Sequence, residues 1–191
     1  MIEPSDRERF VSRILLLHSG VYGHTRKICE HIRATLAASG VAVDVAPITE
    51  PGIDPAGYDG IFIGASIRNG KHNPAVLEFI RGHLGVLESK PGGFFSVSLV
   101  ARKPGKDTAL TNPYKKAFME KCPWKPDLVT VFGGDLDYQR YGAFDRNVIR
   151  FIMWITKGPT DPSTRADYTD WGAVERFAER MGALVRERAA A

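Results

Sequence analysis

Residues 18–25 read HSGVYGHT, a turn that follows the apolar run RILLL and precedes the helix-like stretch RKICEHIRATLAAS. The turn holds Gly20 and Gly23, the hydroxyl side chains of Ser19 and Thr25, and no carboxylate. A helix that begins here presents free backbone N–H groups and the positive end of its dipole, which together attract an anion. Because glycines let the backbone close around such a group, the turn is predicted to bind a phosphate.

Neither of two common phosphate motifs fits this turn. No lysine follows Gly23, as a P-loop requires, and the glycine spacing is not that of the dinucleotide fingerprint. A plain strand-to-helix turn with capping residues therefore stays open as the alternative on spacing alone.

Apolar runs and amphipathic stretches alternate along the rest of the chain. This alternation predicts an α/β fold, a doubly wound five-stranded parallel sheet with helices on both faces. Ligands of such folds bind outside the carboxyl ends of the strands, where the turn 18–25 lies. Strands are predicted at 13–18, 41–47, 58–66, 92–100 and 127–134, and helices at 25–39, 72–89, 112–122, 144–157 and from 169–170 to 188.

Length and composition bound the class of protein. The 191 residues carry a net charge of +4, so an acidic partner is plausible without being required. No apolar run approaches the roughly 20 residues of a membrane helix, and the polar start MIEPSDRERF is unlike a signal peptide. Cys29 and Cys122 stand far apart and are expected to be reduced thiols. We expect a polar extension over 1–12 and a single domain over 13–188, in the cytoplasm.

Five further motifs carry a family resemblance. They are GASIRNGKHNP (64–74), FFSVSLVARKP (94–104), TNPY (111–114), YGAFDRNVIRFIM (141–153) and YTDW (168–171). In this order they resemble the bacterial flavodoxin-type, quinone-dependent protoporphyrinogen IX dehydrogenases, also called protoporphyrinogen oxidases. The resemblance covers nearly the whole chain after the first dozen residues. It implies a flavodoxin-like fold, FMN as cofactor, six-electron oxidation of protoporphyrinogen IX to protoporphyrin IX, and menaquinone or ubiquinone as acceptor.

The resemblance also implies which residues hold the cofactor. Three loops of the flavodoxin type bind FMN, one around the phosphate and one on each side of the flavin ring. Carried over to this sequence, the phosphate loop is Ser19, Gly20, Val21, Tyr22, Gly23, His24 and Thr25, and the ring loops are Ser66, Ile67 and Arg68, and Ser98, Leu99 and Val100.

Basic residues follow the fourth predicted strand. Arg102 and Lys103 would join Arg68, Lys71 and Lys106 at the ligand-binding edge. A porphyrinogen carries propionates, which arginine can hold through paired hydrogen bonds. Arg102 and Lys103 are therefore the predicted substrate-binding residues, with a solvated basic face as the alternative for each residue taken alone.

Residues 135–168 are predicted to be an insert before the last helix. Within it, apolar residues cover about half of the helical stretch 144–157, more than one core-facing side requires. Arg146, Arg150 and Lys157 form a basic stripe that suits an anionic lipid surface. We expect a second apolar environment here, namely a membrane surface at the inner face of the cell membrane, quinone, substrate or another subunit. A core helix with an unusually apolar back is the alternative.

Other functions stay open from the residues alone. A flavodoxin-type electron carrier is disfavoured by the basic charge and the insert, and an NAD(P)H:quinone reductase of related fold has no marked nicotinamide site here. No side chain stands out as a catalytic base, so the catalytic residues are unknown. We expect no metal site and no nucleic-acid partner, and we leave an oligomer open.

Overall fold

The computed structural model describes residues 12–190, so all but the last residue of the predicted extension 1–12 lies outside the described residues. A five-stranded parallel sheet with strand order β2-β1-β3-β4-β5 forms its centre. This order and direction confirm the predicted doubly wound sheet. The strands are β1 (Arg13–Ser19), β2 (Ala42–Pro47), β3 (Gly60–Ser66), β4 (Gly92–Ser98) and β5 (Leu128–Gly133).

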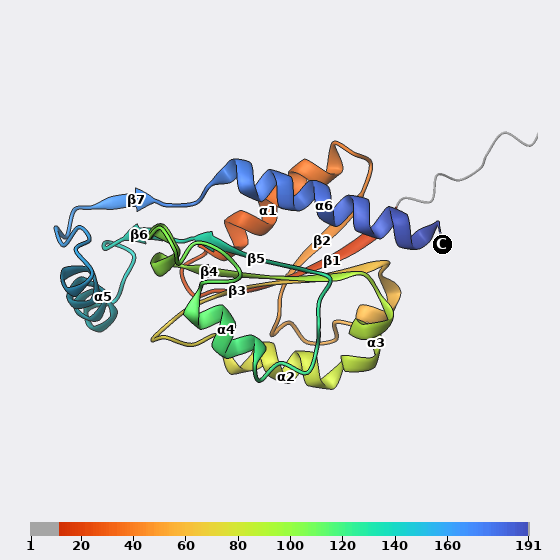
Figure 1. Ribbon diagram of the computed structural model, residues 1–191, viewed down its shortest axis with the longest axis horizontal. Helices are drawn as coiled ribbons and strands as arrows, with labels where there is room; N and C mark the ends of the chain where they lie inside the picture. Colours follow the sequence, from red (N-terminus) through yellow and green to blue (C-terminus); the bar gives the residue numbers. More distant parts are fainter. Residues whose placement is uncertain (1–11, 191) are drawn as a thin grey trace, which may run out of the picture.

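Helices cover both faces of the sheet (Figure 1). They are α1 (His24–Ala37) and α6 (Trp171–Ala189) on one face, and α2 (Pro74–Gly82), α3 (Leu84–Ser89) and α4 (Pro113–Met119) on the other. Alternate residues of a strand point to opposite faces, and neighbours Phe94 and Phe95 accordingly belong to different hydrophobic cores. Phe95 shares its core with residues of α1 and α6, and Phe94 shares its core with residues of α2 and α3.

Side-chain caps fix where three of these helices begin. Asn73 and Asn112 each accept a backbone N–H two residues on and precede a proline at the first helical position. Asp170 accepts the backbone N–H of Ala173, at 3.0 Å, and starts α6 where the sequence predicts.

The stretch 72–89 forms two helices rather than the single helix predicted. His83 separates α2 from α3 with a non-helical backbone, φ −123° and ψ 20°. Its Nδ1 lies 3.0 Å from the carbonyl oxygen of Phe79. Such a local side-chain bond to the backbone competes with continuation of the helix, and Gly82 lowers helix propensity at the same point.

The segment 135–168 projects from one end of the molecule (Figure 1). Two antiparallel strands that were not predicted, β6 (Asp135–Asp137) and β7 (Arg165–Asp167), carry α5 (Ala143–Ile155) at their far end. With three residues each, these strands are too short to show a period in the sequence. Leu136, Tyr138, Tyr141 and Met153 are buried together and hold this end as a small third core. Two short 3₁₀ helices complete the elements, η1 (Pro55–Gly57) and η2 (Leu99–Arg102).

Candidate functional site

A cavity opens at the carboxyl edge of the sheet, where the loops after β1, β3 and β4 meet. We call it the main cavity. Its fourth wall is α5, which contributes Asp145, Val148, Ile149 and Ile152. These four residues are spaced i, i+3, i+4 and i+7 and so lie on one face of the helix. The segment predicted as an insert is therefore part of the site.

The three predicted loops do come together at this edge. Ser19 and Gly20 line a neighbouring cavity, beside the end of β2 and the start of α2, and Gly23 lines neither cavity. Direct contact of each residue with a cofactor stays a prediction. Those of the predicted cofactor residues that line the main cavity are Val21, Tyr22, His24, Thr25, Ser66, Ile67, Arg68, Ser98, Leu99 and Val100.

The turn after β1 has the geometry of a phosphate cradle. Gly23 caps α1 with φ +85°, a left-handed conformation that favours glycine. A Cβ at Gly20 would lie 2.6 Å from Thr25 Oγ1, so only glycine allows this close approach. The hydroxyl oxygens of Thr25 and Ser98 are buried and have no hydrogen-bond partner among the described residues. Because an unpartnered buried hydroxyl costs free energy, these two groups fit a bound ligand rich in hydrogen-bonding oxygens and nitrogens.

The loop after β3 is a tight hairpin at the border of the two cavities. Arg68 and Lys71 exchange backbone hydrogen bonds of 2.9 and 3.1 Å. Asn69 and Gly70 between them have φ of 50° and 77°, as in a type I′ turn, for which Asn-Gly is a preferred pair. This turn places Arg68 in the lining of both cavities.

Asp145 of α5 joins the insert to two of the three predicted cofactor loops. Its Oδ2 accepts hydrogen bonds from the Tyr22 hydroxyl and, at 2.7 Å, from the Arg68 guanidinium. The hydrogen bond from Tyr22 and the charge of Arg68 hold the pKa of Asp145 below its usual value. Burial and the same hydrogen bond raise the pKa of Tyr22. The carboxylate is therefore ionised at neutral pH and fixed in place.

His24 connects the predicted phosphate loop to residues 135 and 169 at the two ends of the insert. Its Nε2 lies 2.7 Å from Thr169 Oγ1, and its Nδ1 lies 3.5 Å from Asp135. Burial lowers the pKa of His24, although Asp135 and Asp167 oppose that shift. The ring is thus held neutral, as an uncharged hydrogen-bonding group beside the loop.

Arg102 and Lys103 line neither cavity. The Arg102 guanidinium donates to the carbonyl of Leu99 and to Thr156 Oγ1, both at 2.8 Å. Thr156 caps the end of α5. The guanidinium therefore connects η2 to the end of α5, and substrate binding by Arg102 and Lys103 stays a prediction.

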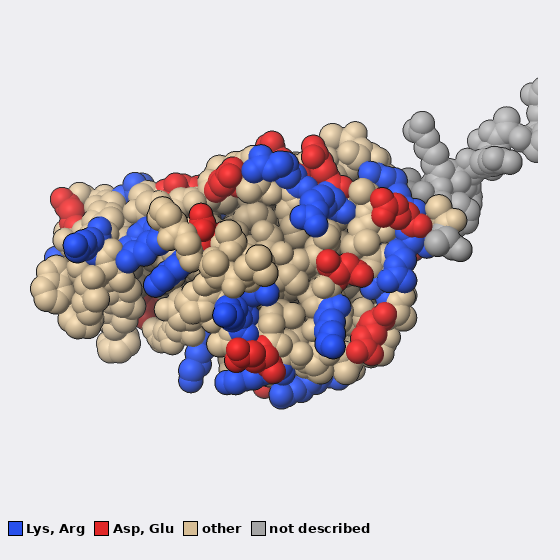
Figure 2. Space-filling model, viewed as in Figure 1, with Lys and Arg blue, Asp and Glu red and all other residues tan. Residues whose placement is uncertain are grey.

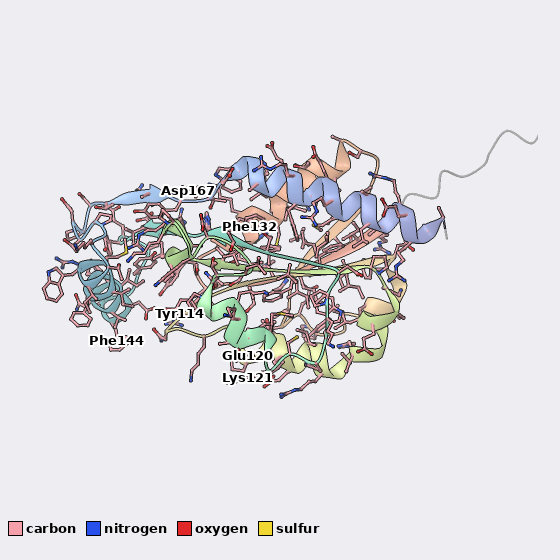
Figure 3. All side chains as sticks on the ribbon, viewed as in Figure 1. Tyr114, Glu120, Lys121, Phe132, Phe144 and Asp167 are labelled. Carbon is pink, nitrogen blue, oxygen red and sulfur yellow. The ribbon has the colours of Figure 1, made fainter. Side chains whose placement is uncertain are left out.

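Sequence reasoning missed several residues of the main cavity. Tyr114 lies at the start of α4 (Figure 3), Asp135 and Tyr141 come from the insert, and Asp145 comes from α5. The i, i+3, i+4, i+7 spacing of Asp145 with Val148, Ile149 and Ile152 was the signal that could have found the α5 wall. This spacing was hard to recognise in the sequence, because apolar residues on another side of α5 outnumber the three apolar residues of the cavity face.

This sheet order and this cavity define a flavodoxin-type protein. The family model described as "Flavodoxin domain" matches residues 15–163. Solved flavodoxins share the fold: a cysteine-to-serine mutant of the flavodoxin from Pseudomonas aeruginosa has a TM-score of 0.55 at 12% identity, covering 91% of this chain and 99% of that chain. A flavodoxin from the domain Archaea has a TM-score of 0.53 at 13% identity, with 91% and 99% covered.

Two curated relatives narrow the class. One from Leishmania major is 42% identical over 90% of this chain and 75% of its own length, and one from Escherichia coli K12 is 41% identical over 90% and 96%. Both are named protoporphyrinogen IX dehydrogenase (quinone). The chain belongs to this family of flavodoxin-domain dehydrogenases.

Proposed function

We propose that this chain uses bound FMN to oxidise protoporphyrinogen IX to protoporphyrin IX and passes the electrons to a respiratory quinone, menaquinone or ubiquinone. The names of the curated relatives support the assignment of substrate and acceptor. The observation in the structure that supports it best is the α5 wall, because Val148, Ile149 and Ile152 offer an apolar surface inside the main cavity. An electron carrier has no need of such a surface, since it binds no organic substrate.

The residues of the main cavity suit the parts of FMN. Thr25 and the first turn of α1 would hold the phosphate, and the loops at Ser66–Arg68 and Ser98–Val100 would flank the ring. The flavin, when bound, supplies the two-electron chemistry. The protein's own contribution is to orient the macrocycle against that ring and, through α5, to limit access of water.

We also propose that α5 rests on the cytoplasmic face of the cell membrane. Phe144, Phe151, Trp154 and Ile155 are 76, 59, 69 and 58% exposed. In Figure 2 the end of the molecule formed by α5 is largely uncharged, with Lys and Arg side chains beside it. An amphipathic helix with these two features binds an anionic lipid surface. No helix among residues 12–190 is long and apolar enough to cross a membrane.

The chemistry is tested by anaerobic titration of the FMN-loaded protein. We expect protoporphyrinogen IX to bleach the oxidised flavin absorption and NADPH to leave it unchanged. Reduction by NADPH instead would indicate a quinone reductase. Reduction by neither compound, with rapid electron exchange to a small redox protein, would indicate an electron carrier.

A further inference from the structure

The carboxylate of Asp145 lines the main cavity with only one of its two oxygens hydrogen-bonded among the described residues. Both hydrogen bonds that it accepts, from Tyr22 and from Arg68, fall on the same oxygen, Oδ2. No described residue donates to the other oxygen, Oδ1, which is not fully buried and so stays accessible. The side chain as a whole is 11% exposed and lines the main cavity.

An ionised carboxylate accepts hydrogen bonds and donates none. Three apolar side chains of the cavity lining, Val148, Ile149 and Ile152, share its face of α5. A charged oxygen that is partly desolvated beside an apolar wall needs a partner. A ligand that lies against this apolar wall and also satisfies Oδ1 combines N–H or O–H donors with an apolar surface.

A porphyrinogen has this chemistry. Every pyrrole nitrogen of the reduced macrocycle carries a hydrogen, and the groups at its edge are apolar methyl and vinyl groups apart from the two propionates. A quinone offers only carbonyl acceptors to the same oxygen, and the electrostatics are then repulsive. The donors of the reduced macrocycle also distinguish it from the porphyrin product, in which half of the pyrrole nitrogens have lost their hydrogens.

We propose that Asp145 Oδ1 accepts hydrogen bonds from pyrrole N–H groups of the substrate, so that Asp145 selects the reduced macrocycle and sets its orientation against α5. This inference rests on the proposed function. Tyr22 and Arg68 act as positioning residues, because their bonds to Oδ2 aim the carboxylate. The arrangement also links substrate recognition to the two cofactor loops from which Tyr22 and Arg68 come.

The test is Asp145→Asn, examined in separate half-reactions of the FMN-loaded protein. The carbonyl of the introduced amide can still accept from Tyr22 and Arg68, which turns its NH₂ donor toward the substrate N–H groups. We expect the second-order rate constant for anaerobic flavin reduction by protoporphyrinogen IX to fall at least about tenfold, as expected for a lost hydrogen bond to a charged group. The FMN dissociation constant and the rate of reoxidation by quinone should change less than about twofold. Binding of protoporphyrin IX, measured by tryptophan quenching, should fall less than reduction by the porphyrinogen does.

Thr156→Val is the matched control for mere loosening of α5. It removes the bond from Arg102 at the other end of the helix and leaves the Asp145 carboxylate intact. Equal slowing of the porphyrinogen half-reaction in both variants would overturn the inference, because it would mean that Asp145 only holds α5 in place. So would loss of FMN from Asp145→Asn, or reduction of that variant at the wild-type rate. A wild-type protein that protoporphyrinogen IX does not reduce would overturn the proposed function, and this inference with it.

Discussion

At the scale of single residues, Thr25 tests whether the turn after β1 holds a phosphate. Its hydroxyl is buried without a partner among the described residues, so Thr25→Ala should remove a hydrogen bond that forms only with ligand. A hydrogen bond to a charged group contributes about 1.5–3 kcal/mol, so the FMN dissociation constant should rise roughly 10- to 150-fold. Fluorescence titration of apoprotein with FMN measures this.

Substitutions at the two glycines of the same turn should weaken FMN binding for different reasons. Gly20→Ala should weaken FMN binding strongly, because its Cβ would meet Thr25 Oγ1 at 2.6 Å. No atom lies within 4 Å of a Cβ at Gly23, so a substitution there acts through its φ of +85° instead. Titrations in which Thr25→Ala and Gly20→Ala both bind FMN like the wild type would remove this turn from the site.

His72 gives a residue-scale prediction about acid stability. Burial against Phe94 and Phe118 lowers the pKa of its ring to about 4. The unfolded chain, with a histidine pKa near 6.5, takes up the proton first as pH falls. The stabilisation is therefore complete above about pH 6.5 and is lost between there and about pH 4.

Denaturant unfolding at two pH values tests whether stability falls with pH in this direction. Between pH 7.5 and 5, His72 should account for a loss of about 2 kcal/mol in the free energy of unfolding. His72→Gln should show a correspondingly smaller loss, whatever its stability at pH 7.5. An identical pH dependence in the two proteins would show that the ring is not held neutral by the fold.

At the scale of elements, a double variant of α5 can show whether its aromatic side chains face a membrane or belong to a core. Phe151 and Trp154 are 59 and 69% exposed, so replacing both with Ser should change the free energy of unfolding by no more than about 0.5 kcal/mol each. The same variant should lose salt-sensitive binding to liposomes that contain anionic lipid. Arg33→Gln, a charge change on the distant helix α1, is the control and should bind like the wild type.

Two results would contradict this account of α5. One is a large drop in melting temperature for the double variant, which would place the two aromatic side chains in a core. The other is wild-type protein that stays off anionic liposomes at low salt.

The sequence predicted well the elements that have a local signal and predicted poorly those that depend on contacts elsewhere in the chain. The strands and the Asn73, Asn112 and Asp170 helix starts could be predicted, because buried parallel strands are continuously apolar and caps are local signals. The split at His83 and the pair β6–β7 could not, because they depend on a side-chain bond and on pairing between residues 135–137 and 165–167.

The candidate site divides in the same way. The loop residues that line the main cavity follow motifs in the sequence. The bond from Arg102 to Thr156, and those from Tyr22 and Arg68 to Asp145, join segments far apart in the chain. Arg102 was predicted to bind substrate from its charge and its place after the fourth strand, and no local pattern shows that its guanidinium meets the Thr156 hydroxyl.

At the scale of the whole molecule, α5 has one apolar face toward the main cavity and another toward solvent. Ile152 belongs to both, since it lines the cavity and is 42% exposed. Figure 3 shows Phe144 beside the same helix, in whose first turn it lies. If α5 rests on lipid, the cavity therefore opens beside the phase in which quinones dissolve.

The central claim is quinone-linked oxidation of protoporphyrinogen IX, and the most direct measurement of it is anaerobic porphyrin formation. FMN-loaded protein is mixed with protoporphyrinogen IX and liposomes that contain menaquinone or ubiquinone, and protoporphyrin IX fluorescence is followed with time. The account predicts fluorescence that rises over many turnovers and requires both FMN and quinone. Porphyrin formation at the same rate without quinone, or none beyond the uncatalysed background with all components present, would contradict it.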